Sequence, residues 1–371
     1  MKICFVGLDN LPVLSEEYNM HGIGGEQVQQ TLLAKAFASR GHQVSMIVYD
    51  YGQPKIHLKD GITAYRAFRQ NSGIPVIRFF HPRWTKTWAA LRQANADVYY
   101  SSCAGMQLGL LALFCKQYDR RLVFRVAHDS DCRPSDLLIK YKRDIKIYEY
   151  GLARANKIFV QTLRQQADLL KNYGRTSSLA RMLVQPALEN VERDVDVLWV
   201  NNVRQFKRPD LFIELVKRLP KLRFRMVGGE QQDSKELYSK IMQEAKRLPN
   251  LTFCGRVPYH AMWENYARAR VFVNTSDSEG FPNSYLQAWA HGTPTVVFFD
   301  PDNIISEAKL GLCATSIAEM AEHILFLLKN QRQWERLSDN CRAFMARNYL
   351  ESDVIAPYLA GIKEVLGCPQ R

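Results

Sequence analysis

Short apolar runs alternate with longer amphipathic stretches along most of the 371-residue chain. The runs 2–7 and 44–49 are rich in β-branched and aromatic residues, as buried strands are. Between them, the stretch 26–40 carries apolar residues at helical spacing and is followed by Gly41, which is typical of a helix end. Strand–helix alternation with nearly continuous apolar strands predicts a parallel sheet covered by helices on both faces.

The same alternation restarts in the second half of the chain. Further predicted strands are 97–100, 122–127, 157–160, 196–200, 223–227, 251–254, 271–274 and 295–298. Further predicted helices are 209–218, 234–247, 261–268, 283–291, 317–329 and 332–349. We therefore predict an α/β protein with two doubly wound Rossmann-like domains, 1–190 and 191–371, facing each other across a cleft. The last helix, about 354–366, is expected to pack back on the first domain. In open α/β sheets the ligand binds at the carboxyl ends of the strands, so the loops there are the candidate sites.

Charge is distributed unevenly over these two domains. The chain is 47% hydrophobic and 23% charged, which excludes a disordered protein. Residues 1–190 carry 26 Lys and Arg against 15 Asp and Glu, whereas residues 191–371 carry 24 against 22. A basic first half indicates an anionic partner: nucleic acid, an acidic membrane surface or a phosphorylated substrate. The alternative is a solvated basic surface. Nucleic acid is disfavoured, since the sequence has no helix-turn-helix, RNP-like strand or basic helix.

The eight cysteines are scattered, without a C-x-x-C pair or zinc-ligand spacing. They indicate reduced thiols and a cytoplasmic protein, and no metal site is expected. The N-terminus has no signal-peptide layout, and the longest apolar run, 108–115, is too short to span a bilayer. Any contact with a membrane is therefore expected at its inner surface, through the basic N-terminal domain.

The most informative stretch is 275–294, Thr-Ser-Asp-Ser-Glu-Gly-Phe-Pro-Asn-Ser-Tyr-Leu-Gln-Ala-Trp-Ala-His-Gly-Thr-Pro. Glu279 lies just before a helix that Pro282 opens, and Gln287 lies inside that helix. The N–H groups at a helix N-terminus bind phosphate, and a carboxylate accepts hydrogen bonds from sugar hydroxyls. These coinciding features favour a sugar-phosphate site. The alternative is that Glu279 only adds a favourable charge near a helix N-terminus.

The loop that follows the predicted strand 196–200 is basic. The stretch 203–209, Val-Arg-Gln-Phe-Lys-Arg-Pro, places Arg204, Lys207 and Arg208 beside the start of a helix. Arginine offers a bidentate fork for phosphate and lysine a mobile point charge. The position at the carboxyl end of a strand favours phosphate binding over a basic surface loop.

A glycine-rich stretch, 21–25 (His-Gly-Ile-Gly-Gly), leads into the first predicted helix. Gly24 and Gly25 allow the backbone to approach an anion closely at the helix N-terminus. The stretch matches neither the dinucleotide fingerprint nor the NTPase phosphate loop. A flexible turn is the open alternative.

A third candidate stretch, 124–131 (Phe-Arg-Val-Ala-His-Asp-Ser-Asp), contains the end of a buried strand of the first domain and the loop after it. His128 is positioned to hydrogen-bond a sugar or to act as a base. The alternative, a satisfied histidine beside an aspartate that caps a helix, remains equally open.

An aromatic stripe, Trp84, Trp88 and Leu91, lies in the basic stretch 81–92. It fits a membrane-surface helix or a core-facing helix, and the core is favoured. The stretch 140–157 is a second basic candidate, weakened by the acidic residues inside it.

The stretch from Glu279 to Pro294 resembles the signature of glycosyltransferase family 4, whose members are retaining enzymes of the GT-B architecture. The likeness extends over nearly the whole chain. Its further elements are Gly24-Gly25 with 33–42, Arg204 with Lys207, His128, and 253–257 (Phe-Cys-Gly-Arg-Val).

The resemblance implies a transferase that moves a sugar from a nucleotide-diphosphate sugar to a hydroxyl of a saccharide, lipid-linked or other glycoconjugate acceptor. It implies same-face substitution, with no protein nucleophile, metal or other cofactor. The second domain would hold the donor, and the first would hold an acceptor that its charge suggests is anionic or membrane-borne. The catalytic residues implied are Glu279, His128, Arg204 and Lys207. The donor-binding residues implied are Gly24, Gly25, Arg204, Lys207, Arg208, Val257, Glu279, Gly280, Phe281, Pro282, Asn283 and Gln287.

The chain departs from the family pattern at two points. Gln287 stands where the family has a second glutamate, and glutamine accepts a hydrogen bond through only one of its terminal atoms. The spacing from Arg204 to Lys207 is also short, which makes Arg208 the alternative second cation. Two other functions stay open: a nucleotide-sugar-binding protein with weak or no transfer activity, and a sugar-nucleotide epimerase of the same fold.

Overall fold

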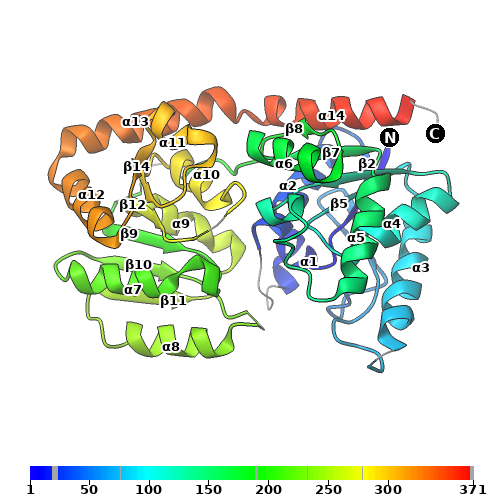
Figure 1. Cartoon of the computed structure of the whole chain (residues 1–371), viewed down its shortest axis with the longest axis horizontal. Helices are drawn as coiled ribbons and strands as arrows, with labels where there is room; N and C mark the ends of the chain where they lie inside the picture. Colours follow the sequence, from blue (N-terminus) through cyan, green and yellow to red (C-terminus); the bar gives the residue numbers. More distant parts are fainter. Residues whose placement is uncertain (19–23, 76, 189–190, 232, 278, 368–371) are drawn as a thin grey trace. The chain divides into compact units, whose positions relative to one another are not determined.

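The computed structural model describes residues 1–18, 24–75, 77–188, 191–231, 233–277 and 279–367. The chain divides into two compact units (Figure 1). Unit 1 consists of Met1–Leu183 with Glu351–Arg371, and unit 2 of Val184–Leu350. The chain thus returns to unit 1 with its last helix. The boundary between the units lies between residues 183 and 184, whereas the sequence predicted it between 190 and 191.

Unit 1 is built on an eight-stranded sheet with the order β3-β4-β2-β1-β5-β6-β7-β8. The strands are β1 (Lys2–Val6), β2 (Gln43–Val48), β3 (Ile56–Lys59), β4 (Ile62–Arg66), β5 (Val98–Ser102), β6 (Arg121–Arg125), β7 (Lys157–Val160) and β8 (Ser178–Leu179). The sequence analysis identified β1, β2, β5, β6 and β7. The strands β3, β4 and β8 were not predicted.

The prediction of a parallel sheet is wrong at one edge, because β3 pairs antiparallel with β4. Only Asp60 and Gly61 connect these strands, and both have positive φ, at 51° and 73°. A two-residue turn with both φ values positive joins antiparallel neighbours, whereas a parallel pair needs a long crossover. The Asp-Gly dipeptide is the sequence signal for this hairpin. All other strand pairs in the two sheets are parallel.

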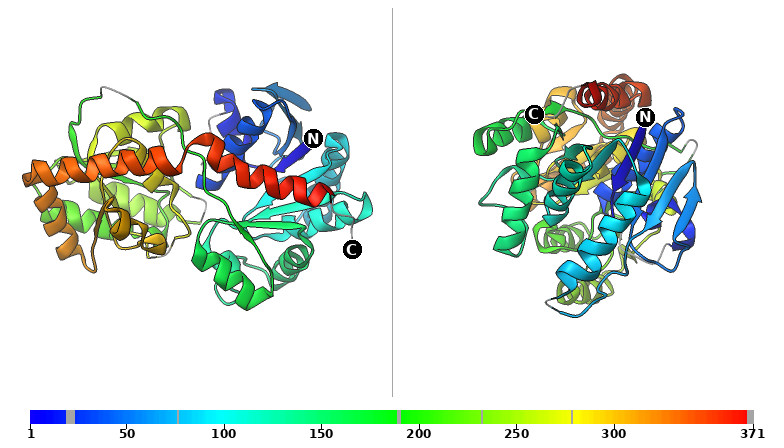
Figure 2. Two further views of the ribbon diagram at one scale, coloured as in Figure 1. Left: turned by 90° about the horizontal axis from the view of Figure 1, so that it is seen from above. Right: turned by 90° about the vertical axis from the view of Figure 1, so that its right-hand side faces the viewer.

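Helices cover both faces of the unit 1 sheet. They are α1 (Leu11–Leu14), α2 (Gly25–Ala38), α3 (Thr85–Ala94), α4 (Met106–Gln117), α5 (Lys142–Arg154), α6 (Leu163–Tyr173) and α14 (Glu351–Gly367). Helices α3 to α6 share one hydrophobic core with the sheet. On the other face, Phe37 of α2 packs on Phe5, and Tyr358 of α14 packs on Phe159. Figure 2 shows α14 lying along the strands β6 to β8 that it contacts.

Unit 2 contains a six-stranded parallel sheet with the order β11-β10-β9-β12-β13-β14. The strands are β9 (Val195–Val200), β10 (Phe224–Val227), β11 (Leu251–Gly255), β12 (Ala269–Asn274), β13 (Thr295–Val297) and β14 (Gly311–Cys313). The helices are α7 (Pro209–Arg218), α8 (Lys235–Ala245), α9 (Met262–Ala267), α10 (Asn283–Ala290), α11 (Ile304–Ala308), α12 (Ile317–Lys329) and α13 (Gln331–Asn348).

The central strand β12 shows how unit 2 buries both faces of its sheet. Val271 and Val273 belong to the core shared with α7, α8 and α12. Phe272 points to the opposite face, where its ring contacts Tyr266 of α9 and Tyr285 of α10. Side chains alternate between the faces of a strand, so a continuous apolar run is what a doubly covered strand requires. No helix formed by the described residues is both long enough and apolar enough to cross a bilayer.

Helices α4 and α5 approach each other closely in unit 1 because glycines lie at their contact. A Cβ on Gly109 would lie 2.2 Å from the carbonyl oxygen of Ile147, and one on Gly151 would lie 2.5 Å from the carbonyl carbon of Leu108. This packing places Tyr148, whose hydroxyl donates to the carbonyl oxygen of Asp131 at 2.8 Å. The helix pair therefore supports the loop that contains His128.

We expect Gly109→Ala and Gly151→Ala each to lower the free energy of unfolding, by roughly 1–3 kcal/mol, as overpacking does. The matched control is Gly367→Ala in α14, where an added Cβ has no neighbour within 4 Å among the described residues. Chemical denaturation measures the difference. Equal stability of the Gly109 and Gly367 variants would contradict the close helix contact.

Candidate functional site

Backbone hydrogen bonds join the loops that follow four neighbouring strands of unit 2. The amide of Gly228, after β10, donates to Gly255 at the end of β11 at 2.9 Å. The amide of Val203, after β9, donates to Gly229 at 3.2 Å. The amide of Asp277, after β12, donates to Phe206 at 2.9 Å. The carboxyl edge of the sheet is thus one continuous layer of loops, and the predicted donor residues of this unit lie on it.

A buried ion pair connects two of these loops. Lys207 Nζ lies 2.5 Å from both carboxylate oxygens of Glu279. The Lys207 side chain is 15% exposed and that of Glu279 is 7% exposed. Glu279 also accepts from Asn274 Nδ2 at 3.2 Å, and Ser276 Oγ lies 2.6 Å from its Oε1. The cation and the carboxylate predicted as separate site residues therefore form one charge-neutral unit.

This environment keeps Glu279 ionised. Burial by itself opposes ionisation, but the Lys207 charge, together with hydrogen bonds from Lys207, Ser276 and Asn274, outweighs it and lowers the pKa of Glu279. A buried carboxylate is stable only when its charge is compensated and its lone pairs are hydrogen-bonded. Glu279 therefore presents acceptor oxygens and not a proton.

Residues that the sequence analysis missed hold this pair in place. Thr275 accepts from the indole N–H of Trp199 at 3.0 Å, and its Oγ1 lies 2.9 Å from the carbonyl oxygens of Lys207 and Arg208. These contacts anchor the short 3₁₀ turn η5 (Gln205–Lys207) on the exit of β12. The sequence signal was available, since the buried strand β12 ends at the polar Asn274 and is followed directly by Thr275 and Ser276.

The two arginines of the basic loop differ in their surroundings. The Arg208 guanidinium donates to Asp210, with Nη2–Oδ2 at 2.9 Å, and to Asp277 at 3.2 Å. Arg208 is therefore already engaged by two carboxylates. Arg204 Nε is buried, lies 3.9 Å from Asp233 Oδ1, and has no hydrogen-bond partner among the residues described. Of the two, Arg204 is better placed to receive an anionic group.

Helix α10 begins close to Glu279. Pro282 is its N-cap residue, one position before the helix, and it cannot donate a hydrogen bond. Gly280 and Phe281 are buried in the preceding loop, and Asn283 opens the helix. Within the helix, Gln287 is buried, and its Oε1 has no hydrogen-bond partner in the described part of the chain. Gln287 therefore retains an unused buried acceptor one turn into the helix.

The remaining predicted donor residue, Val257, is half-buried in the loop after β11. Gly228 follows the neighbouring strand β10, and a Cβ there would lie 2.3 Å from the carbonyl oxygen of Asn201. The exits of β9 and β10 can therefore approach only through a glycine. The Gly228–Gly255 hydrogen bond then joins the loop that contains Val257 to the same layer as Arg204.

In unit 1, His128 lies after β6 and caps the short helix η4 (Asp129–Cys132). Its Nδ1 accepts from the Ser130 amide at 3.1 Å, while Asp131 Oδ2 accepts from the His128 amide at 3.1 Å. Because Nδ1 is an acceptor here, the proton of the neutral ring resides on Nε2. His128 is thus oriented as a hydrogen-bond donor through Nε2. The predicted alternative made an aspartate the helix cap, whereas here His128 is the N-cap residue and Asp131 completes the capping box. Asp129 is buried and accepts from Gln165 at 3.0 Å.

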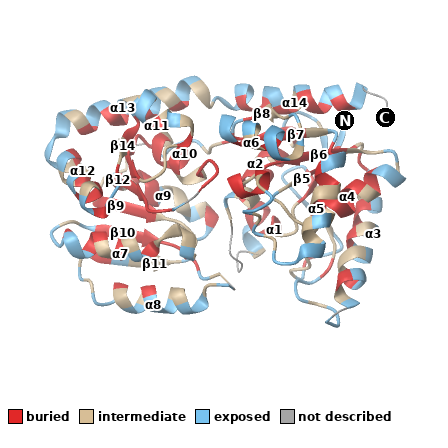
Figure 3. Cartoon of the chain, in the orientation of Figure 1, coloured by how far each residue is buried: buried red, intermediate tan, exposed pale blue. Residues whose placement is uncertain are grey.

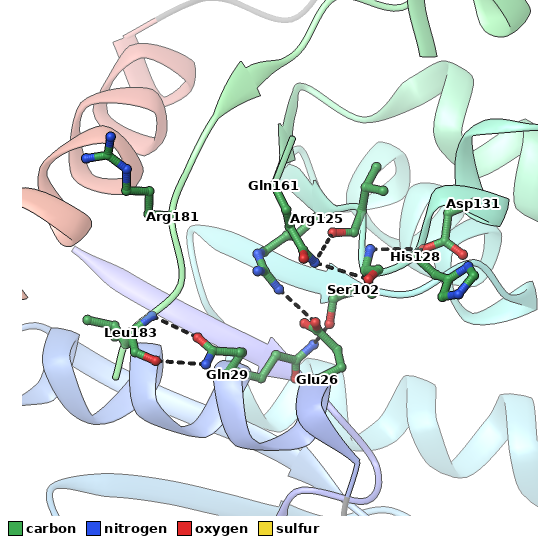
Figure 4. A network of polar contacts seen from close by, with 12 residues as sticks. Glu26, Gln29, Ser102, Arg125, His128, Asp131, Gln161, Arg181 and Leu183 are labelled. Atoms are coloured by element: carbon green, nitrogen blue, oxygen red, sulfur yellow. Dashed lines mark hydrogen bonds and ion pairs between the residues drawn. The ribbon is translucent and has the colours of Figure 1, made fainter. Parts of the chain in front are cut away.

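A second buried ion pair joins the glycine loop to this histidine loop. Gly24 is the N-cap residue of α2 and Gly25 its first residue, and Glu26 Oε2 lies 2.7 Å from Nη1 of the buried Arg125. Figure 4 shows Glu26 on α2 facing Arg125 near His128. The pair brings Gly24–Gly25 and His128 to the same edge of the unit 1 sheet. The sequence analysis missed it, although an arginine inside an apolar strand was the signal. His21, Gly22 and Ile23 of the predicted motif lie outside the described residues.

The aromatic stripe of α3 belongs to the core, as the sequence analysis favoured. Leu91 is fully buried, and Trp84 and Trp88 pack against the same cluster. The Trp88 ring lies 5.1 Å from that of Phe114. The stripe itself is therefore not a membrane-binding face.

The fold defines the class of this protein. HepE of Anabaena, solved in complex with UDP and glucose, aligns over 98% of this chain and 100% of its own, with a TM-score of 0.76. The sequence identity is 14%, so the likeness concerns the fold alone. The chain has the GT-B architecture with two doubly wound α/β units, as predicted.

The sequence of unit 2 matches a family model. Residues 184–344 match the model of the family described as glycosyl transferases group 1, which confirms the predicted resemblance in that part of the chain. The α-galactosylglucosyldiacylglycerol synthase of Streptococcus pneumoniae is 30% identical over 168 residues, which make up 44% of each chain. The α-monoglucosyldiacylglycerol synthase of Acholeplasma laidlawii is 26% identical over 133 residues, 35% of this chain and 33% of the relative. The matches thus span less than half the length of these relatives.

The buried pair makes a stability prediction. Lys207→Ala and Glu279→Ala each leave an uncompensated buried charge, so each should lower the free energy of unfolding by roughly 3–5 kcal/mol. The double variant Lys207→Met, Glu279→Leu should lose much less than the two single variants together. The control is the exposed pair Lys217–Glu244, at 2.7 Å, whose removal should cost no more than about 1 kcal/mol. Additive losses at Lys207 and Glu279 would contradict the coupling.

The lowered pKa of Glu279 also makes a pH prediction. The stabilisation is complete above the pKa of an unfolded glutamate, ~4.3, and is lost as the pH falls through the lower folded pKa. Acid titration of unfolding free energy should therefore show a steeper decline below pH ~4 for the natural protein than for Glu279→Gln. Parallel curves would refute the assignment.

Proposed function

We propose that this protein is a retaining glycosyltransferase that moves a sugar from a nucleotide-diphosphate sugar to a hydroxyl of a saccharide or lipid-linked acceptor. The observation that carries the proposal is the Lys207–Glu279 pair at the start of α10, flanked by Arg204 and the buried acceptor of Gln287. The group 1 match over residues 184–344 supports the glycosyl-transfer class. The UDP and glucose in the HepE structure support a nucleotide-sugar donor.

In this proposal the bound donor replaces part of the contact between Lys207 and Glu279. The diphosphate binds Arg204 and Lys207, and Glu279, freed from part of its contact with Lys207, accepts hydrogen bonds from sugar hydroxyls. The cations stabilise the negative charge that develops on the leaving diphosphate, and such preorganised charges commonly supply the largest rate effect. Since these cations neutralise the diphosphate, the proposal includes no metal ion.

The acceptor side of the proposal rests on unit 1. The Nε2 proton of His128 donates to the transferred sugar, and the backbone at Gly24 and Gly25 approaches an anionic group at the N-terminus of α2. Same-face substitution lets the leaving diphosphate help remove the proton of the acceptor hydroxyl, so no protein base is needed. A lipid-linked acceptor is supported by the two diacylglycerol-glycosylating relatives, and a cytoplasmic location facing the membrane fits such an acceptor.

The first test is turnover. The purified protein should release a nucleoside diphosphate from one member of a panel of UDP-, GDP- and ADP-sugars when an acceptor is present, and the sugar should appear on the acceptor. Lys207→Ala should reduce this rate by on the order of 10²–10³-fold, because a preorganised charge is lost. Lys217→Ala, in the exposed pair of the same unit, should leave it unchanged.

The alternatives predict other products. An epimerase would alter the sugar while leaving it on the nucleotide, and a binding protein would shift the thermal unfolding temperature without turnover. Undiminished transfer by soluble Lys207→Ala would remove the ion pair from the mechanism.

The second test concerns Gln287, which in this proposal accepts a hydrogen bond from a ribose hydroxyl of the donor. A carboxylate accepts from two vicinal ribose hydroxyls, whereas the amide accepts through one atom only. Gln287→Glu should therefore tighten binding of the matching ribonucleoside diphosphate, roughly tenfold for one added charge-assisted hydrogen bond. The 2′,3′-dideoxy analogue, titrated in parallel, should gain nothing. An equal gain for both nucleotides would place Gln287 away from the ribose.

A further inference from the structure

Two loops of unit 1 expose large apolar side chains beside each other. One precedes α3 and the other precedes α5. Each of the following side chains is more than half exposed: Ile74, Ile77, Phe80, Leu138 and Tyr141. We call these residues, with the basic residues described below, the apolar–basic patch. Large exposed apolar groups gathered in one place mark an interaction surface more often than single ones do.

A direct contact holds the two loops together. The guanidinium of Arg143, at the start of α5, lies over the ring of Phe79, with its central carbon 3.9 Å from the ring centre. Phe79 itself is buried and packs edge-on against Trp84, 5.7 Å between ring centres. The patch is therefore anchored to the core through Phe79 while its apolar residues stay on the surface. Figure 3 shows exposed residues in the loop before α3 and at the adjoining end of α5.

The same two loops are strongly basic. Between residues 74 and 86 there are Arg78, Arg83 and Lys86 and no acidic residue. Between residues 137 and 146 there are Lys140, Lys142, Arg143 and Lys146, and the single acid, Asp144, pairs with Arg143 at 2.8 Å. The patch thus carries a local surplus of six positive charges, a large share of the surplus of the first half of the chain.

The topology places this patch at the edge where the unit 1 site residues lie. One loop follows β4 and the other follows β6, and both strands run parallel to β1 and β5. The carboxyl ends of parallel strands lie at one edge of the sheet, so the patch shares an edge with the Gly24–Gly25 turn and with His128.

We propose that the apolar–basic patch docks unit 1 on an anionic lipid surface. Aliphatic side chains such as Ile74, Ile77 and Leu138 gain free energy by entering the boundary between headgroups and acyl chains, and flanking lysines and arginines are attracted by anionic headgroups. A second copy of the chain is a poor partner, because two such patches would bring like charges together. This surface does not depend on the proposed transferase activity, and its test uses no sugar donor.

The test measures binding to vesicles by flotation. Vesicles of phosphatidylcholine mixed with phosphatidylglycerol should bind the full chain at low salt, vesicles of pure phosphatidylcholine should bind it weakly, and added salt should release it. The charge variant is Lys140→Gln, Lys142→Gln, Lys146→Gln. It should weaken partitioning into the vesicles by on the order of a hundredfold, because each of the three lysines strengthens partitioning several-fold and these factors multiply. The matched control is Lys235→Gln, Lys240→Gln, Lys246→Gln, which removes three exposed lysines of unit 2, two on α8 and one directly after it.

An apolar variant tests the other half of the patch. Ile77→Asn with Leu138→Asn should weaken binding at least about tenfold, since two side chains no longer enter the lipid. Leu163→Asn with Leu170→Asn, two exposed leucines of α6, should bind as the natural protein does. Thermal unfolding of each variant checks that it is folded.

Three outcomes would overturn the proposal. The first is no binding of the natural protein to anionic vesicles at low salt. The second is equal loss of binding in the patch variants and their controls. The third is a natural protein that forms dimers which only the patch variants disrupt, since the patch would then be an interface between copies of the chain.

Discussion

The organisation of the site in unit 2 depends on one buried ion pair, Lys207 with Glu279. Neither charge is stable in the interior by itself, so the protein surrounds the pair with hydrogen bonds from Asn274, Ser276 and the Thr275 loop. That requirement ties the exit of β9 to the exit of β12 and sets the position of the turn that carries Arg204.

Unit 1 uses the same device at the corresponding edge of its sheet. The Glu26–Arg125 pair joins the start of α2 to the end of β6, and burial raises the pKa of Glu26 against the opposing effect of the Arg125 charge. The glycine turn and the histidine loop are thereby held by a contact that neither loop makes alone. The two units therefore place their polar chemistry in the same way: apolar strands build the core, and a compensated charge pair closes the edge where the loops meet.

Much of this could be predicted from the sequence. The strands β1, β2, β5, β6 and β7 and those of unit 2 up to β13 were identified because each is a mostly apolar run bounded by turn residues. The short edge strands β3, β8 and β14 were missed, since an edge strand pairs with one neighbour only and needs little apolar character. The interior strand β4 was missed as well, because Thr63 and Arg66 interrupt its apolar pattern. Glu279, Lys207 and His128 were selected because each follows a strand of a parallel sheet. The partners of Glu279, Asn274 and Ser276, and the separate pair of Glu26 with Arg125 were not, because a hydrogen-bond partner is defined by distance in space and not by spacing along the chain.

The sequence by itself determined the class of fold and the edges that carry the chemistry, because apolar periodicity decides which faces are buried and parallel strands must end at a common edge. Only the tertiary structure decided which polar residues pair with each other. It paired Lys207 with Glu279 and engaged Arg208 with Asp210 and Asp277, and it left an acceptor atom of Gln287 buried without a partner in the described chain. It also separated the aromatic stripe of α3, which is core, from the apolar residues just before it, which are exposed. The pairing of polar residues and the burial of apolar ones both depend on which segments distant in sequence come within a few ångströms of each other. The local pattern of the sequence does not determine those contacts.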